Sequence, residues 1–372
     1  MSNAYVGAAA SRGRSASAAV TDVLLLGPGS VGCAVLEQLA PLRDAGLRVT
    51  GVVDRRGALL SARGFDAAEL HALIALKRSG AALDAAPGAV AAPLETLLGR
   101  FLASTAGPKV VVDTTAMSSG PLVLQALAGG CDVVLANKIP LVGDQASVRA
   151  IASTAAIHGR RVRHEATVGA GLPVIETIAR LEASGDTIVQ IEGCPSGTLG
   201  FVFAEVARGV PFSVAVRAAH EAGYTEPDPR CDLSGLDVAR KALILARCLG
   251  FEGELTDLAV EALVPPQFGG ASVEAFFEAL PALDAAWAER SASAAAAGAV
   301  LRYRVRVTPR AVQVGVVEVP RGGALGALQG TDNQFAFTTA RYAERPLVIT
   351  GPGAGAAVTA AGVVGDVLAL LR

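Results

Sequence analysis

Residues 23–32 read Val23-Leu24-Leu25-Leu26-Gly27-Pro28-Gly29-Ser30-Val31-Gly32, a fully apolar run that ends in three spaced glycines. A helical pattern of apolar residues follows through Leu39. This order is typical of a strand, a tight turn and a helix that together bind a dinucleotide. The first glycine makes the turn, the second lets backbone approach a pyrophosphate, and the third lets the helix pack on the strand. Cofactor contacts are therefore expected from Gly27, Gly29, Ser30, Val31 and Gly32.

The residues after the next apolar segment bear on the choice of cofactor. Segment 49–53 ends at Asp54, 22 residues beyond Gly32, where an acid can accept hydrogen bonds from the adenosine ribose and favour NAD. Arg55 and Arg56 follow at once, and a guanidinium can hold the 2′-phosphate of NADP through paired hydrogen bonds. Both arginines could instead point into solvent. We expect Asp54, Arg55 and Arg56 near the cofactor, with NADP and NAD both accepted.

Apolar runs alternate with helical patterns over the first 150 residues. Strands are expected at 109–113 and 132–136, in addition to those at 23–26 and 49–53. Because these strands are apolar throughout, they predict a parallel sheet covered on both faces by helices. The fold class is therefore α/β, with a Rossmann-type doubly wound parallel sheet.

Polar residues follow two of these strands. Thr114 and Thr115 come directly after 109–113, and Asn137-Lys138 come shortly after 132–136. Ligands of open α/β sheets lie outside the carboxyl ends of the strands, so these side chains are expected to contact cofactor or substrate rather than cap helices. Lys138 is the most informative, because a cation beside a cofactor can also polarise a carbonyl.

Beyond about residue 160 the pattern changes. Helical patterns at 212–222 and 236–249 follow a strand-like segment at 188–191. Residues 301–307 alternate apolar and polar, which predicts a strand with one solvated face, and valines at 312, 314 and 316 belong to its expected partner. This region is expected to be an α+β domain for substrate binding or dimerisation.

The composition of the 372 residues narrows the class of protein. The chain is 52% apolar and 18% charged with a formal net charge of −2, which gives no electrostatic footprint for nucleic acid or an anionic membrane. Five scattered cysteines without a CxxC pair favour a reduced, cytoplasmic protein and argue against a zinc site.

The uncharged run at 346–365 is expected to form a strand, a Gly-rich turn and a helix, not a membrane span. Residues 1–20 are expected to be a disordered tail, with an organelle-targeting peptide as the alternative.

The densest polar segment of the chain is 223–241. Two prolines stiffen a loop that holds Glu226, Asp228 and Asp232, and a helix then places Asp237 and Lys241 at i and i+4 on one face. Such a pair could be a solvated helix pair worth roughly a few tenths of a kcal/mol. The surrounding helix is, however, mostly apolar. Acids gathered around one lysine suit an amino-acid-like substrate, whose ammonium the carboxylates bind and whose oxygen the lysine protonates.

Segment 224–241 resembles the signature of homoserine dehydrogenases, and further stretches match that family in the same order. These stretches are 27–32, 137–138, 164–173, 193–199, 331–333 and 351–355. Together they extend over about residues 20–372. The chain resembles the short, monofunctional form of the enzyme, for which no aspartate kinase domain and no regulatory ACT domain is expected.

The resemblance implies reversible reduction of L-aspartate 4-semialdehyde to L-homoserine with NAD(P)H, a step toward threonine, methionine and isoleucine. In the family, the lysine matching Lys241 donates and accepts the proton at the substrate oxygen, and the aspartate matching Asp237 orients the substrate. Lys138 matches a lysine near both nicotinamide and substrate, and completes the expected catalytic set. The residues expected to bind substrate are Glu226, Asp232, Asp237, Gly197 and Thr198, and Gly353 and Gly355 are expected to join the cofactor site.

The resemblance also implies a sodium ion, a homodimer and a discontinuous nucleotide domain. Sodium would be held by Glu165 and by the main-chain oxygens of Val168, Ala170 and Leu172. The dimer would form through the sheet of the second domain. The expected boundaries are a tail at 1–20, a dinucleotide-binding domain at 21–155 and 345–372, and a substrate-binding and dimerisation domain at 156–344.

Two other functions fit parts of this pattern. Aspartate-semialdehyde dehydrogenase has the same pair of folds but needs a cysteine nucleophile, for which Cys194 and Cys231 are the candidates near the polar segments. A dinucleotide-sensing protein without chemistry would keep the fold but would not need the clustered acids and lysines.

Overall fold

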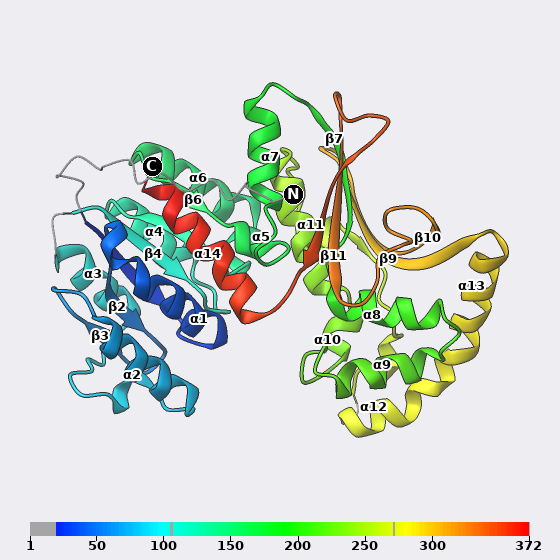
Figure 1. The fold of residues 1–372 in the computed structure, drawn as a ribbon, viewed down its shortest axis with the longest axis horizontal. Coiled ribbons are helices and arrows are strands. Elements are labelled where there is room, and N and C mark those ends of the chain that lie inside the picture. Colours follow the sequence, from blue (N-terminus) through cyan, green and yellow to red (C-terminus); the bar gives the residue numbers. More distant parts are fainter. Residues whose placement is uncertain (1–19, 105–106, 271, 372) are drawn as a thin grey trace, which may run out of the picture.

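A six-stranded sheet forms the N-terminal part of the computed structural model, which describes residues 20–104, 107–270 and 272–371. Its strand order is β3-β2-β1-β4-β5-β6 (Figure 1). β3 is antiparallel to β2, and all other neighbours are parallel. The strands are β1 (Thr21–Leu26), β2 (Leu47–Val53), β3 (Ala58–Leu60), β4 (Lys109–Asp113), β5 (Asp132–Leu135) and β6 (Val162–Arg163). Of the predicted tail, residues 1–19 lie outside the described residues.

Helices cover both faces of this sheet, as the apolar strands predict. All six positions of β1 are buried, because Val23 and Leu25 pack on one helical layer while Leu24 and Leu26 pack on the other. One layer consists of α1 (Ser30–Leu39), α2 (Ala67–Arg78) and α14 (Ala356–Leu370). The other consists of α3 (Leu94–Ser104), α4 (Gly120–Ala128) and α6 (Gln145–Ile157). The prediction of a Rossmann-type sheet is confirmed.

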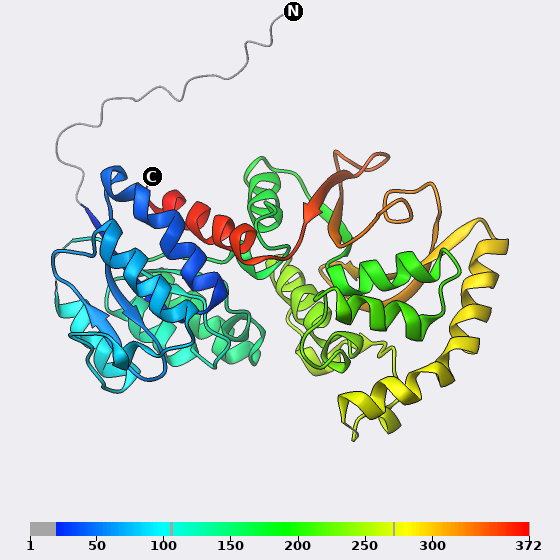
Figure 2. The same ribbon diagram turned by 60° about the horizontal axis from the view of Figure 1, so that its bottom comes forward.

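A second six-stranded sheet has the order β12-β11-β7-β9-β10-β8. Its neighbours are antiparallel, except that β8 runs parallel to β10. The strands are β7 (Ile188–Cys194), β8 (Ala259–Val260), β9 (Ala299–Val307), β10 (Val312–Pro320), β11 (Asp332–Thr339) and β12 (Leu347–Pro352). The helices that share its core include α7 (Val174–Ala183), α8 (Gly197–Val206), α9 (Phe212–Glu221), α10 (Arg230–Leu233), α11 (Leu236–Cys248), α12 (Val273–Ala279) and α13 (Asp284–Ala296). Figures 1 and 2 show this α+β domain beside the first one.

The polar face of β9 is less solvated than its alternating sequence predicts. Arg306 is exposed, but Arg302 is buried and donates hydrogen bonds to five main-chain carbonyls, three of them in the 325–328 loop. The loop that covers this face follows β10, 23 to 26 residues after Arg302 in the chain. The prediction of one wet face is therefore wrong at Arg302, although the pairing of β9 with β10 is confirmed.

Sheet membership differs from the expected domain boundaries at two places. β6 lies in the first sheet although 156–344 was assigned to the second domain, because Val133 and Val134 of β5 pair with it. β12 lies in the second sheet although 345–372 was assigned to the first, because it pairs along six residues with β11. The chain returns to the nucleotide domain only with α14.

The uncharged C-terminal run forms β12, a Gly-rich turn and α14, as predicted. Among the described residues, no helix has both the length and the apolar character needed to cross a membrane.

Candidate functional site

The Gly-rich turn has the geometry that dinucleotide binding requires. Gly27 has φ +85°, a left-handed conformation that favours glycine. A side chain at Gly32 would lie 2.3 Å from the carbonyl oxygen of Gly27, so this position needs glycine for the close approach of α1 to the turn. Gly29 faces open space, with nothing within 4 Å of an added Cβ. Ser30, Val31 and Gly32 begin α1, so their N–H groups have no carbonyl one turn earlier and can bind an anion.

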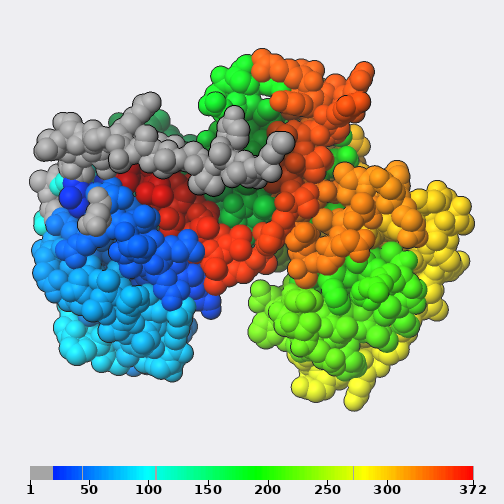
Figure 3. Space-filling model, in the orientation of Figure 1, coloured from blue at the N-terminus to red at the C-terminus, as the bar shows by residue number. Residues whose placement is uncertain are grey.

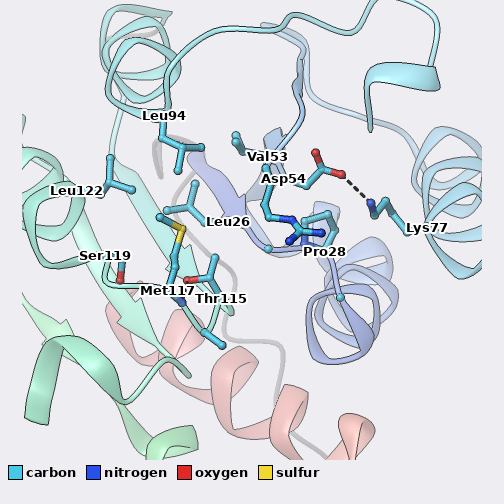
Figure 4. A pocket seen from close by; sticks show the side chains of 14 residues that line it. Leu26, Pro28, Val53, Asp54, Lys77, Leu94, Thr115, Met117, Ser119 and Leu122 are labelled. Carbon is cyan, nitrogen blue, oxygen red and sulfur yellow. Dashed lines mark hydrogen bonds and ion pairs between the residues drawn. The ribbon is translucent and has the colours of Figure 1, made fainter. Parts of the chain in front are cut away.

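A cavity of about 570 Å³ opens beside this turn (Figure 4). It lies at the carboxyl ends of β1, β2 and β4. The chain adds β2 and β3 on one side of β1 and then β4, β5 and β6 on the other side, so the cavity occupies the switch point at which open α/β sheets bind ligands. Of the predicted cofactor residues, it brings together Gly27, Gly29, Asp54, Arg55 and Thr115. The remaining lining is mainly apolar, with Leu26, Val53, Leu94 and Leu122 placed to contact a base or ring. An elongated nucleotide with a phosphate at the Gly-rich turn fits this arrangement.

Asp54 lies in the cavity wall as predicted, but its carboxylate is engaged inside the protein. Oδ1 accepts hydrogen bonds from the N–H groups of Arg56 (2.9 Å) and Gly57 (3.1 Å). Oδ2 accepts from Nζ of Lys77 (2.6 Å) and from the N–H of Leu83 (2.9 Å). These four donors fill the usual acceptor sites of a carboxylate. The geometry therefore favours a role in shaping the turn over the predicted role of binding ribose hydroxyls.

The pKa of Asp54 reflects these contacts. Burial would raise it, but the Lys77 ammonium and the N–H groups of Arg56 and Leu83 outweigh burial and lower the pKa below its ordinary value. Asp54 is thus ionised, and the positive charge of Lys77 offsets its negative charge. Its repulsion of a nearby phosphate is correspondingly reduced.

The two arginines after Asp54 have different surroundings. Arg56 forms an ion pair with Asp84 at 2.8 Å and does not line the cavity. Arg55 lines the cavity and is exposed, with no ion pair to any other described residue. Of these two arginines, Arg55 is therefore the one placed to meet a charged group of the cofactor.

A buried polar network connects the cavity to Lys138. The carboxylate of Asp113 accepts hydrogen bonds from the hydroxyls of Thr115 (2.7 Å) and Ser119 and from Nδ2 of Asn137 (3.0 Å). Oδ1 of Asn137 in turn accepts the N–H of Ile139 at 3.0 Å, which fixes the main chain on both sides of Lys138. Thr114, predicted to face the cofactor, instead donates its hydroxyl to the carbonyls at Leu26 and Gly27 and supports the turn from behind.

Lys138 reaches across to the second domain. Its Nζ lies 3.1 Å from Oδ1 of Asp237, and Nζ of Lys241 lies 2.8 Å from Oδ2 of the same carboxylate. Lys241 also donates to the carbonyl oxygen of Pro195 at 2.7 Å, just beyond the end of β7. The three residues predicted to be catalytic are therefore in direct contact, although they come from different domains. The helix pair Asp237–Lys241 is no isolated surface pair, since Lys241 is only 13% exposed.

The two lysines control the ionisation of Asp237. Partial burial would raise its pKa, but the ammonium groups of Lys241 and Lys138 lower it far below the ordinary value of an aspartate. Asp237 is therefore negatively charged at neutral pH. Its side chain remains 48% exposed, so the pair is open on one side.

A second cavity of about 580 Å³ lies on this open side, lined by Glu226, Asp228, Asp232 and Asp237 among others. Oδ2 of Asp232 accepts the N–H of Glu226 at 2.9 Å, and the hydroxyl of Thr198 lies 3.1 Å from Oδ1. Asp228 is different, because Arg230 neutralises it through a bidentate contact. Glu226 and Asp232 thus remain as acids that can meet a cationic group.

Arg240 lines the same cavity, although no sequence pattern singled it out. It forms no ion pair with another described residue, in contrast to Arg230 and the two lysines nearby. Three residues after Asp237, it lies on nearly the same helix face. Figure 3 shows that the yellow-green surface containing this segment faces the blue nucleotide domain across an open gap.

The other predicted glycines lie in turns close to these groups. Gly197 begins α8, and a side chain there would lie 2.8 Å from the carbonyl oxygen of Thr331. Gly353 packs on Asn333 so closely that an added Cβ would overlap its side chain. Gly355 has φ +110° and immediately precedes α14. Neither Gly353 nor Gly355 lines the cofactor cavity, so their predicted cofactor contact stays a prediction.

The predicted sodium ligands have other partners in this structure. Both carboxylate oxygens of Glu165 accept N–H groups at the start of α7, from Ile175 and Glu176 at 2.8 Å each. The carbonyl of Leu172 accepts the N–H of Val174, and that of Ala170 lies against the backbone of α14. Val168 is buried in the same turn. No cluster of three or more metal-binding side chains occurs among the described residues. Sodium binding remains a prediction.

The two candidate cysteine nucleophiles are not activated. Burial raises the pKa of Cys194 to about 12. Partial burial, together with the carboxylates of Asp228, Asp232 and Glu226, raises the pKa of Cys231 as well. A catalytic cysteine needs the opposite shift, so this geometry argues against a thioacyl mechanism.

A cavity suited to a nucleotide, a lysine–aspartate contact between domains and an acidic second cavity are the parts that an NAD(P)-dependent oxidoreductase uses. Comparison with known proteins specifies the family. The model for the homoserine dehydrogenase NAD-binding domain matches residues 27–165, and the homoserine dehydrogenase model matches residues 173–368. The chain belongs to the homoserine dehydrogenase family.

Individual relatives agree with this assignment. A homoserine dehydrogenase of Emericella nidulans is 36% identical, with 94% of this chain and 97% of that protein covered. A chloroplastic bifunctional aspartokinase/homoserine dehydrogenase of Zea mays is 39% identical over 93% of this chain, which spans 38% of that relative's length. Among solved structures, a protein of unknown function from Candida auris has a TM-score of 0.84 at 34% identity, covering 94% of this chain and 98% of its own. A hyperthermophilic archaeal homoserine dehydrogenase in complex with NADPH shares the fold, with a TM-score of 0.72 at 21% identity and coverage of 93% and 96%.

Proposed function

We propose that this chain catalyses the reversible reduction of L-aspartate 4-semialdehyde to L-homoserine with NAD(P)H. Family membership supports the reaction, and the contact between Lys138, Asp237 and Lys241 supports the assignment of roles. The reaction would serve the synthesis of threonine, methionine and isoleucine.

The hydrogen bonds of Lys241 carry the proposal. An ammonium group has three N–H donors. One of those of Lys241 goes to Asp237 and one to the carbonyl of Pro195. The third would serve a substrate oxygen that enters beside Asp237, the partner of Lys241 that lines the adjoining cavity, and Lys241 would protonate that oxygen.

The chemistry follows from where charge develops. Bound NAD(P)H supplies the hydride that is added to the aldehyde carbon. Negative charge then grows on the aldehyde oxygen, where the ammonium of Lys241 stabilises it and transfers a proton. Asp237 remains ionised and holds Lys241 in place. Lys138 adds a second positive charge from the cofactor side of the gap.

Substrate binding is proposed to use the acidic cavity. Glu226 and Asp232 would hold the substrate ammonium, since no basic side chain of the described residues neutralises either of them. Arg240 would meet the substrate carboxylate, because it is the guanidinium of this cavity that lacks an ion pair among the described residues. Gly197 and Thr198 would form the floor beside them.

We also propose a cytoplasmic homodimer. All five cysteines are free, which suits a reducing compartment. The outer face of the second sheet carries exposed Val348 and the half-buried ion pair Arg304–Glu192, a surface suited to a second copy of the chain. Sedimentation of the purified protein would test this, and a concentration-independent monomer would contradict it.

A direct assay tests the reaction. We expect L-homoserine to produce NAD(P)H absorbance, and L-aspartate 4-semialdehyde to consume it without a requirement for phosphate. Reduction of NADP by the semialdehyde only when phosphate is present would instead identify the thioacyl chemistry of the rival dehydrogenase. The C194S and C231S variants should retain turnover, because neither thiol is placed in the proposed mechanism.

A further inference from the structure

The short helix α5 (Ile139–Val142) connects the two domains. It follows β5 in the nucleotide domain, yet Leu141 and Val142 pack against the core of the substrate domain. Lys138 immediately precedes α5 and contacts Asp237 of α11. The position of α5 on α11 therefore determines where Lys138 lies relative to Asp237.

Arg247 holds the other end of α5. This arginine lies near the end of α11 and its side chain is only 8% exposed. Its Nη1 donates to the carbonyl oxygens of Leu141 (2.7 Å) and Gly143 (2.9 Å), at the C-terminus of α5. A cation is well placed there, because these carbonyls have no partner within the helix.

Glu254 extends this contact to α6. Its Oε2 accepts Nη2 of Arg247 at 3.1 Å, and its Oε1 accepts the N–H of Gln145 at 2.7 Å. Gln145 is the first residue of α6. Arg247 and Glu254 together thus bind the end of α5 and the start of α6, on either side of the 143–144 turn.

α11 consequently attaches to segment 138–143 at two points. Asp237 and Arg247 are ten residues apart on α11, about 15 Å along the helix axis. Two attachments at that separation fix both the position and the direction of α5, whereas one would leave it free to pivot. Arg247 is buried while Glu254 is 38% exposed, so the pair itself adds little net stability, and its contribution here is to the placement of α5.

We infer that Arg247 is a positioning residue that sets the distance between Lys138 and the Asp237–Lys241 pair. The inference rests on the proposed function for its effect on turnover, while its structural part concerns only the attachment of α5. Arg247 does not line either cavity. It acts through Lys138.

A double-mutant cycle tests this dependence. Arg247→Met should lower kcat about 10- to 100-fold, since a misplaced catalytic group costs that much, with little change in the KM for cofactor. In the Lys138→Met background the same substitution should change kcat less than about twofold, because the group it positions is already absent. The free energy of unfolding of the four proteins should show coupling between the two positions as well.

Two further variants serve as controls. Arg149→Ala removes an exposed ion pair of α6 with Glu252 across the same junction, and should leave kcat within about twofold. Arg247→Lys keeps the charge but cannot reach both sets of acceptors, so it should show a smaller loss with the same dependence on Lys138. This variant replaces Arg247→Met in the cycle if the latter does not fold.

The outcomes separate the two proposals. Equal losses of kcat in both backgrounds, with no coupling in unfolding, would overturn the positioning role. Coupling in unfolding together with an unchanged kcat for Lys138→Met would support the attachment of α5 and contradict the role given to Lys138 in the proposed function.

Discussion

The proposed site contains two aspartate–lysine pairs, Asp54–Lys77 in the first domain and Asp237–Lys241 in the second, and their surroundings differ. Asp54 accepts four hydrogen bonds, three from main-chain N–H groups and one from Lys77. Asp237 has a lysine on each oxygen and remains half exposed beside a cavity. Both carboxylates have a lowered pKa. The shift alone therefore does not distinguish a structural pair from a catalytic one.

The difference lies in how open the carboxylate remains. Lys77, near the end of α2, donates to Asp54 and to the carbonyl of Ala81, and the side chain of Asp54 is only 12% exposed. Lys241 also has two partners, but Asp237, which it binds, is 48% exposed and lines the substrate cavity. Asp54–Lys77 is therefore a closed pair, and Asp237–Lys241 is an open pair that a ligand can reach.

Removing the lysine of the open pair should have the largest effect. Lys241→Ala is expected to lower kcat about 100-fold or more, the scale for a lost general acid, because the developing oxyanion loses its proton donor. Cofactor affinity, measured by fluorescence titration, should stay close to normal. Lys241→Arg keeps the charge and serves as the matched control for ion pairing with Asp237. Near-native turnover of folded Lys241→Ala would make Lys138 the leading proton donor.

Arg55, the residue after Asp54 of the closed pair, should affect the choice between NADP and NAD. Arg55→Ala is expected to weaken NADP binding about 10- to 100-fold while NAD binding changes little, since a charged hydrogen bond is worth roughly 1.5–3 kcal/mol. Arg56→Ala is the matched control, because Arg56 is occupied by Asp84. The measurement is the KM for each cofactor in the three proteins. Equal effects of the two substitutions would remove the distinction between the arginines.

The open cavity should also discriminate by substrate charge. Arg240→Gln is expected to raise the KM for L-homoserine about tenfold, because the substrate carboxylate loses its cation. 3-Aminopropan-1-ol lacks that carboxylate and should lose nothing in the same variant. A parallel loss for both compounds would assign Arg240 a structural role instead.

Removing the charge of Asp54 should lower the stability of the protein and leave kcat nearly unchanged. Asp54→Asn is expected to lower the free energy of unfolding by about 1 kcal/mol at neutral pH, since the amide keeps one acceptor but not the charge. The pKa of Asp54 is lowered by folding, so its contribution is complete above the ordinary pKa of an aspartate and is lost as the pH falls through the folded value. Urea unfolding should therefore show wild type and variant converging at acidic pH. A large loss of kcat at saturating cofactor would contradict this assignment.

Local sequence patterns predicted the nucleotide domain well because its determinants are local. The apolar strands, the Gly-rich turn and the positive φ at Gly27 follow from short-range sterics and burial on both sheet faces. The role of Asp54 could not be read in this way. One of its donors is the N–H of Leu83, 29 residues away, and only the tertiary structure brings it close.

The same limit applies in the second domain. The i, i+4 spacing of Asp237 and Lys241 was visible in the sequence, and their contact with Lys138 followed only from family resemblance. No sequence pattern indicated the role of Arg247, because its acceptors are main-chain carbonyls about 105 residues earlier in the chain. β12 was assigned to the wrong sheet for a related reason, since strand pairing is settled by a distant partner.

The return of α14 to the first domain has a consequence for the order in which the protein folds during synthesis. Val363, Val367 and Leu370 of α14 complete the layer that contains α1, and Asp366 binds Arg163 at 2.8 Å. These residues leave the ribosome after the whole second sheet. The nucleotide domain must therefore wait, with part of its apolar surface uncovered, while a domain encoded later reaches its final form first. Chains that end at residue 355, and are tethered to the ribosome by an added linker longer than the exit tunnel, should accordingly show a protease-resistant second domain and a protease-sensitive first one.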